Sequence, residues 1–97
     1  MKPSEILALH RDEILACFAR HPKLSNLRVF GSVARGEDTE DSDIDFLINI
    51  KPGTTLIDIG AFCSDLQEIV GDNFDLTEEC SLPTRFKEKV LKEAIVV

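Results

Sequence analysis

The sequence predicts one small domain of the α/β (α+β) class over residues 1–97, in which helices back a mixed β-sheet. Short apolar runs with a period of two alternate along the chain with longer runs of helical periodicity. A chain of 97 residues has room for one hydrophobic core. The composition, 43% hydrophobic and 30% charged, supports a soluble globular protein.

The N-terminal part of the chain predicts a single helix. Ser4 is a candidate N-cap for a helix from about Glu5 to Arg20. The pair His21–Pro22 should end it, because the residue before a proline disfavours helical backbone angles. The apolar positions of this segment approximate one stripe, formed by Ile6, Leu7, Ile14, Leu15, Cys17 and Phe18.

A short strand and a turn come next. Leu27–Phe30 is expected to be an apolar strand, and Gly31 closes it where the backbone needs an unusual conformation or a close approach to a ligand. One or two helical turns over residues 32–35 should follow, until Gly36 stops them. The acidic segment Glu37–Ser42 is expected to be a solvated loop.

The middle of the chain predicts the central strand and a long helix. Ile44–Ile50 alternates, with its isoleucines and Phe46 on one face and its polar residues and Leu47 on the other. After a Lys-Pro-Gly turn, Thr54 or Thr55 is expected to cap a helix over about Leu56–Val70.

The C-terminal part predicts a third strand, a last helix and a closing strand. Phe74–Thr77 should be a strand with Asp75 on the face opposite its two apolar neighbours. Pro83 suits the first turn of a helix that runs to about Glu93. Residues 94–97 are expected to add a terminal strand.

The bulk charge restricts the partners. The net charge is −7, and six acidic residues lie between Glu37 and Asp45, where cations should relieve their repulsion. Such a surface disfavours direct binding to nucleic acid and favours a basic protein or a substrate that arrives with magnesium. No apolar run is long enough to span a membrane and no signal peptide is visible, so the cytoplasm is the expected location.

The most informative motif is Gly31–Ser32, ten residues ahead of the pair Asp43 and Asp45. Two carboxylates separated by one residue on a strand point to the same face, so both can reach one pair of divalent cations. Asp75, in the third strand, is the best candidate for a third carboxylate. The cations would hold phosphate oxygens and activate an attacking hydroxyl, whose proton Asp75 could help to accept.

The Gly-Ser turn is expected to bind phosphate. The Ser32 hydroxyl and the N–H groups around Gly31 and Ser32 can donate to phosphate oxygens. Arg35, one helical turn later, offers a planar fork to phosphate or, equally well, a salt bridge to the acidic loop.

Other polar residues have ordinary structural interpretations. The three cysteines are read as reduced and mostly buried, and the two histidines lack a second histidine at ligand spacing. Glu78–Glu79 is expected in a solvated loop. On the last helix, pairing at i,i+4 explains the lysines that lie among Glu88 and Glu93.

The combined motif resembles the signature of the polymerase-beta-like nucleotidyltransferase superfamily, in its minimal single-domain branch. The residues that carry the resemblance are Gly31–Gly36, Ser42–Asp45 and Phe74–Leu76. It implies Asp43, Asp45 and Asp75 as catalytic ligands of two Mg²⁺ ions. It also implies that the nucleotide is ATP, bound by Gly31, Ser32, Arg35 and Ser42.

The resemblance further implies an antitoxin that transfers AMP from ATP to a tyrosine of a HEPN-domain ribonuclease toxin and forms a hetero-oligomer with it. Larger relatives that modify aminoglycosides carry an added helical domain, which this sequence lacks, so a separate basic partner is expected to present the hydroxyl. Two alternatives stay open at this point. One is an antitoxin that neutralises the toxin by binding alone, and the other is transfer to a small molecule of the aminoglycoside type.

Overall fold

Four strands form one mixed sheet in the order β3-β2-β1-β4, which confirms the predicted fold class. The computed structural model describes residues 1–97. β1 runs antiparallel to both β2 and β4, whereas β2 and β3 are parallel. The strands are β1 Leu24–Phe30, β2 Ile44–Ile50, β3 Phe74–Glu78 and β4 Ile95–Val96.

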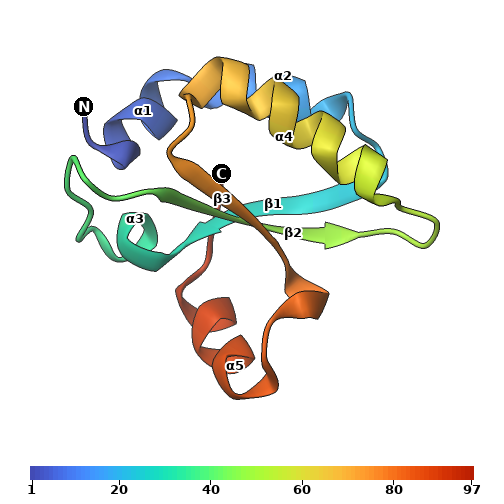
Figure 1. The fold of residues 1–97 in the computed structure, drawn as a ribbon. Coiled ribbons are helices and arrows are strands. Elements are labelled where there is room, and N and C mark those ends of the chain that lie inside the picture. The colour runs from blue at the N-terminus through green and yellow to red at the C-terminus, as the bar shows by residue number, and fades with distance from the viewer.

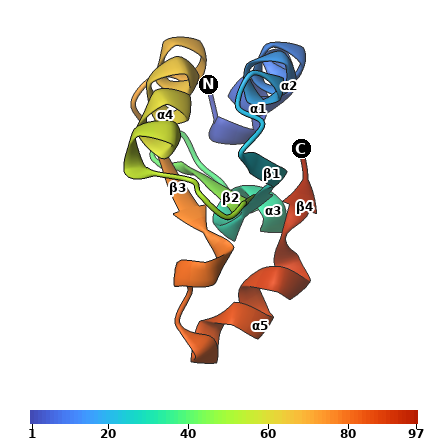
Figure 2. The same ribbon diagram turned by 90° about the vertical axis from the view of Figure 1, so that its right-hand side faces the viewer.

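The helices divide between the two faces of this sheet (Figures 1 and 2). Helices α1, α2 and α4 cover one face, and α5 lies on the opposite side with the short 3₁₀ turn η1 before it. Helix α3 follows β1 directly at the end of that strand. The helices are α1 Pro3–Leu9, α2 Arg11–Ala19, α3 Gly31–Arg35, α4 Leu56–Val70 and α5 Thr84–Glu93, with η1 at Glu79–Ser81.

The expectation of one N-terminal helix was wrong, because the chain breaks into α1 and α2 at His10. The His10 N–H closes α1 on the Ile6 carbonyl, and the His10 carbonyl accepts the Ile14 N–H that starts α2. The break lets two short helices follow the sheet at different angles. Ser4 is also not the N-cap, which is Lys2.

The acidic loop is not wholly solvated as expected, because Asp38 is buried. Its Oδ2 accepts the Ser4 N–H at 2.9 Å, and only 8% of the residue is exposed. The first turn of a helix leaves N–H groups without partners, and this carboxylate supplies one. The same hydrogen bond holds the pKa of Asp38 below its usual value. Asp38 therefore ties the loop to α1.

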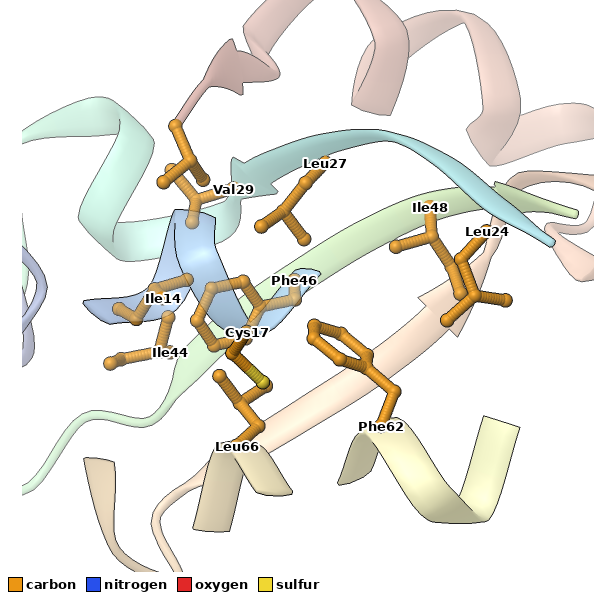
Figure 3. Packing of buried hydrophobic residues seen from close by; sticks show 11 residues of the cluster. Ile14, Cys17, Leu24, Leu27, Val29, Ile44, Phe46, Ile48, Phe62 and Leu66 are labelled. Carbon is orange, nitrogen blue, oxygen red and sulfur yellow. The ribbon is translucent and has the colours of Figure 1, made fainter. Parts of the chain in front are cut away.

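The main core lies between the sheet and helices α2 and α4 (Figure 3). Phe46 from β2 meets Phe62 and Leu66 from α4 and Cys17 from α2, and all four are fully buried. Burial raises the pKa of the Cys17 thiol. All three cysteines are free, but the expectation that they are mostly buried was wrong, because Cys63 is half-buried and Cys80 is exposed. No helix in the structure has the length and hydrophobicity to cross a bilayer.

The central strand and the long helix have the bounds that the sequence predicts. β2 covers 44–50 and α4 covers 56–70, with the Thr55 hydroxyl accepting the Asp58 N–H as an N-cap. β1 starts three residues earlier than expected, because a bulge between Ser25 and Arg28 carries the strand through polar residues. Asn26 takes a positive φ of 56° within that bulge.

A buried ion pair lies on the second face of the sheet. Arg28, only 7% exposed, donates to Glu79 at 2.9 Å and to Asn49 at 2.9 Å. Glu79 is therefore not in the solvated loop that the sequence predicts, since η1 folds it back over the sheet. The Arg28 guanidinium holds the pKa of Glu79 below its usual value.

Candidate active site

The strand register brings the predicted carboxylates together. Asp45 of β2 lies directly opposite Asp75 of β3 in the parallel pair, so the two side chains share one face. Asp43 stands just before β2, two residues from Asp45 and on the same side by alternation. Asp45 is half-buried, whereas Asp43 and Asp75 are exposed. The three acids thus line one face near the start of β2 and β3.

The electrostatics of this face suit a cation. Burial raises the pKa of Asp45, and the neighbouring charges of Asp75 and Asp43 raise it further, against a smaller lowering by Arg35. A divalent cation would remove this repulsion, because its positive charge favours the ionised carboxylates. Carboxylate oxygens are also the donors that Mg²⁺ prefers. The donor set therefore fits a magnesium site.

Gly31 is required by its contact with Asp45. Phe30, the last residue of β1, pairs with Asp45, so Gly31 is placed against that side chain. A Cβ on Gly31 would overlap Oδ2 of Asp45. The φ angle of Gly31 is +73°, which side chains also disfavour. The sequence-based expectation of an unusual conformation is confirmed by this φ, whereas the close approach is to the Asp45 side chain and the expected approach to a ligand stays a prediction.

The two phosphate-binding candidates on α3, Ser32 and Arg35, differ in the hydrogen bonds that they make. Ser32 is half-buried, and its hydroxyl has no hydrogen-bond partner in the structure. Arg35 donates to Glu37 at 3.1 Å and to both oxygens of Glu93 at 3.1 and 3.2 Å. These bonds raise the pKa of Arg35, and the bond to Glu37 has the larger effect. The salt bridge to the acidic loop, one of the two interpretations of Arg35, is therefore present.

Ser42, the remaining nucleotide candidate, is used within the acidic loop. Its hydroxyl oxygen accepts the Thr39 N–H at 2.9 Å and lies 3.4 Å from the Thr39 hydroxyl. This bond closes the turn that leads into β2. Ser42 thereby shapes the approach to Asp43.

Glu93 is a site residue that the sequence did not reveal. Its Oε2 accepts the Gly31 N–H at 2.6 Å, while both its oxygens accept from Arg35. The interpretation of Glu93 as an i,i+4 partner of the lysines was wrong, and only Glu88 with Lys92 forms such a pair. The separation of 62 positions between Gly31 and Glu93 leaves no local signal for this contact.

A second cluster escaped the sequence analysis. Cys17, His21 and Asp65 place one ligand atom each within 4.8 Å of one another, across α4 and the C-terminal end of α2. His21 Nε2 lies 2.9 Å from Asp65 Oδ2, and its ring contacts Phe62 edge-on at 5.4 Å. Hydrogen bonding and packing account for these side chains. They share no residue with the carboxylate site on β2 and β3.

The family of the chain follows from a family model. The model described as polymerase beta, nucleotidyltransferase, matches residues 12–97, which include all three carboxylates and the Gly-Ser turn. The chain belongs to the polymerase beta nucleotidyltransferase family. It is therefore a nucleotidyltransferase, and the site described above is its candidate active site.

Sequence relatives of this nucleotidyltransferase have a more specific name. A protein adenylyltransferase, MntA, of Thermococcus cleftensis is 32% identical over 95% of this chain and 89% of its own length. A protein of Methanocaldococcus jannaschii with the provisional name of protein adenylyltransferase is 34% identical over 95% of this chain and 90% of its own. Both relatives match this chain nearly end to end.

Solved structures share the fold. A protein provisionally described as a minimal nucleotidyltransferase superposes with a TM-score of 0.83 and 41% identity, over 98% of this chain and 96% of its own. A toxin-antitoxin structure with AMP-PNP has a TM-score of 0.71 and 22% identity, over 88% of this chain and 69% of its own. At that identity the second likeness shows the fold alone.

Proposed function

We propose that residues 1–97 act as a single-domain, magnesium-dependent protein adenylyltransferase and antitoxin. The nucleotidyltransferase transfers AMP from ATP to a tyrosine hydroxyl of a HEPN-domain ribonuclease toxin in the cytoplasm. The observation that carries the proposal is the register of Asp45 opposite Asp75, with Asp43 beside them and Gly31 in contact. This arrangement provides carboxylate ligands and phosphate donors side by side.

The reaction breaks a phosphoanhydride bond of ATP and forms a phosphate ester bond to the tyrosine. The tyrosine oxygen forms a bond to the α-phosphorus of ATP, and the bond from that phosphorus to the oxygen leading to the β-phosphate breaks, so that pyrophosphate leaves. Bound divalent cations would screen the phosphate charge and lower the pKa of the attacking hydroxyl. Asp43, Asp45 and Asp75 would hold these cations, and Asp75 would accept the hydroxyl proton. Ser32 and the N–H of Gly31 would orient the triphosphate.

The choice of a protein acceptor rests on the relatives and on charge. Two relatives that span this chain almost completely are named protein adenylyltransferases. Structures with the same fold occur in toxin-antitoxin pairs, one of them with AMP-PNP. A net charge of −7 favours a basic partner through electrostatic complementarity. These points support the proposal of a hetero-oligomer with a toxin.

Transfer of α-labelled ATP to proteins of the source cell tests the proposal. With magnesium present, we expect the wild type to label one discrete protein on tyrosine, identified by mass spectrometry. The Asp43→Asn/Asp45→Asn variant should lose this label while its unfolding transition is retained. The matched control is Glu40→Gln/Asp41→Asn, which removes two charges from the exposed neighbouring loop and should keep the label.

An antitoxin that acts by binding alone gives a different result. In that case no label is transferred, and the Asp43→Asn/Asp45→Asn variant still protects cells that express the toxin. Growth protection and label transfer measured on the same variants separate the two functions. Retained protection without transfer would overturn the catalytic proposal.

A further inference from the structure

Glu93 occupies the donors that a phosphate group would use. Its Oε2 accepts the Gly31 N–H at 2.6 Å, and its two oxygens accept from Arg35 at 3.1 and 3.2 Å. A carboxylate presents two oxygens to such donors much as a phosphate presents a pair of its oxygens. The Glu93 side chain is only 17% exposed, so this is an inserted group rather than a loose surface charge.

Glu93 and a phosphate cannot share the Gly31 donor, although the Arg35 guanidinium keeps further N–H groups. A backbone amide has one hydrogen, so the Gly31 N–H that serves Glu93 is withdrawn from any other acceptor. Glu93 also adds negative charge beside Asp45, where Asp75 and Asp43 already repel it. A triphosphate entering beside a retained Glu93 would meet one more anion and one fewer donor.

The Glu93 side chain has an alternative position beside a basic residue of the same helix. Lys89 lies one helical turn earlier on α5, at the i,i+4 spacing that pairs opposite charges. A pocket of about 210 Å³ lies between α5 and α3, lined by Phe86, Lys89 and Val90 on the α5 side and by Gly31 and Arg35 on the other. A rotation of the Glu93 side chain toward Lys89, along the α5 side of this pocket, would free the Gly31 N–H and keep the Glu93 charge paired. The helix itself does not have to unfold.

We propose that Glu93 is a displaceable latch that closes the phosphate site of the nucleotide-free protein and is expelled when the triphosphate binds. The inference rests on the proposed function, because it assumes that Gly31 and Arg35 bind the triphosphate. In the latched state Glu93 ties α5 to the signature turn. In the nucleotide-bound state Gly31 and Arg35 contact phosphate, and Glu93 pairs with Lys89.

The opposite role for Glu93 is to position Arg35 and Gly31 for the phosphate. The two roles predict opposite signs for one substitution. Removing the charge of a latch strengthens phosphate binding, since the competitor is weakened. Removing the charge of a positioning residue weakens phosphate binding, since the donors lose their orientation.

The deciding measurement is the Kd for inorganic tripolyphosphate and for AMP-PNP, each with magnesium, by titration calorimetry. The variants are Glu93→Gln, which keeps the shape of the side chain, and Glu88→Gln, which makes the same charge change on the exposed side of α5. We expect Glu93→Gln to bind both probes about tenfold more tightly than the wild type, the effect of one charge-assisted hydrogen bond at a partly exposed site. Glu88→Gln should match the wild type.

Thermal unfolding of each variant serves as the control, and the variants should unfold at temperatures close to that of the wild type. In the wild type, tripolyphosphate should also shift the backbone amide resonances of Gly31 and of residues 89–93, because the latch moves. Equal or weaker binding by Glu93→Gln overturns the latch but leaves the nucleotide site intact. No binding of either probe to any variant overturns the latch and the proposed function together.

Discussion

The two faces of β2 differ in what their residues do. On the face toward α2 and α4, Ile44, Phe46 and Ile48 are at most 2% exposed and form the centre of the core. On the other face, at the same end of the strand, Asp45 is half-buried and Asp43 is exposed. Because successive side chains of a strand point to opposite faces, β2 places apolar side chains in the core and carboxylates at the candidate site.

This comparison teaches that stability and chemistry are separable along β2. The apolar face lowers the free energy of folding through burial and close packing. The acidic face opposes folding slightly, since burial raises the pKa of Asp45 and disfavours its charge. Substitutions of the apolar residues on the first face should therefore change stability, and substitutions of Asp43 and Asp45 on the second should change activity.

The largest effect is expected at Phe46. Phe46→Ala should cost about 3–5 kcal/mol of stability, because it removes a fully buried aromatic ring and leaves a cavity against α4. Urea denaturation followed by circular dichroism measures this loss. Asp45→Asn, one residue away, is the matched control and should keep or slightly raise the free energy of unfolding. A comparable loss in both variants would contradict the separation of the two faces.

The next largest effect is expected at Gly31, which contacts Asp45 on the acidic face of β2. Gly31→Ala should cost about 2 kcal/mol or more, because it adds a collision with Asp45 to the strain of a positive φ. Gly53→Ala isolates the second cause, since Gly53 has φ +86° and a Cβ added there would meet no atom within 4 Å. That control should cost about 1 kcal/mol. Equal losses in denaturation would show that Asp45 moves aside freely.

A smaller, pH-dependent effect is expected at the Arg28–Glu79 pair. Arg28 lowers the pKa of Glu79 in the folded protein, so the pair stabilises the fold above the unfolded pKa of about 4.3. This stability is lost as the pH falls through the lower, folded pKa. Glu79→Gln should cost about 1–2 kcal/mol at pH 7, because buried Arg28 loses its charged partner, and this cost should shrink as the pH falls below the unfolded pKa.

Denaturant unfolding at pH 7, 4 and 3 measures this difference. Glu88→Gln serves as the control, because its pair with Lys92 is exposed and should contribute little at any pH. Parallel pH profiles for the wild type and Glu79→Gln would exclude a stabilising role for the ion pair.

The smallest effect should come from the cap of α4, far from both faces of β2. Thr55→Ala should cost about 1 kcal/mol, because the Asp58 N–H loses its side-chain acceptor at the helix start. Thr55→Ser keeps the hydroxyl and should restore most of the stability in the same thermal melts. A loss in Thr55→Ser as large as in Thr55→Ala would assign the effect to the methyl group instead.

The sequence predicted those parts of the fold that depend on local patterns. Strict alternation defined β2, and a capping threonine followed by an apolar stripe defined α4. Alternation predicted that Asp43 and Asp45 share a face, and Asp75 was predicted from its place in a short apolar strand. The register that sets Asp75 opposite Asp45 comes from the structure, and the role of the three as metal ligands stays a prediction. Gly31 was found because a glycine after an apolar strand is unusual enough to need a reason.

The sequence did not predict contacts that join distant segments. Asp38 meets Ser4 across 34 residues, Arg28 meets Glu79 across 51, and Gly31 meets Glu93 across 62. Each pairs a charged side chain with a group brought near only by the folded sheet. From a single sequence, such a residue cannot be distinguished from a charged residue on the surface. The second role of Arg35, toward phosphate, stays a prediction for the same reason.

The contact between Gly31 and Asp45 also constrains how this chain can evolve. A side chain at position 31 would collide with the carboxylate at position 45, so position 31 is constrained for as long as Asp45 is kept. A descendant that first exchanges Asp45 for a smaller residue would release position 31 from the collision, though not from its positive φ. Loss of the Asp45 carboxylate would therefore come before substitution of the glycine, and a lineage would show the two changes in that order.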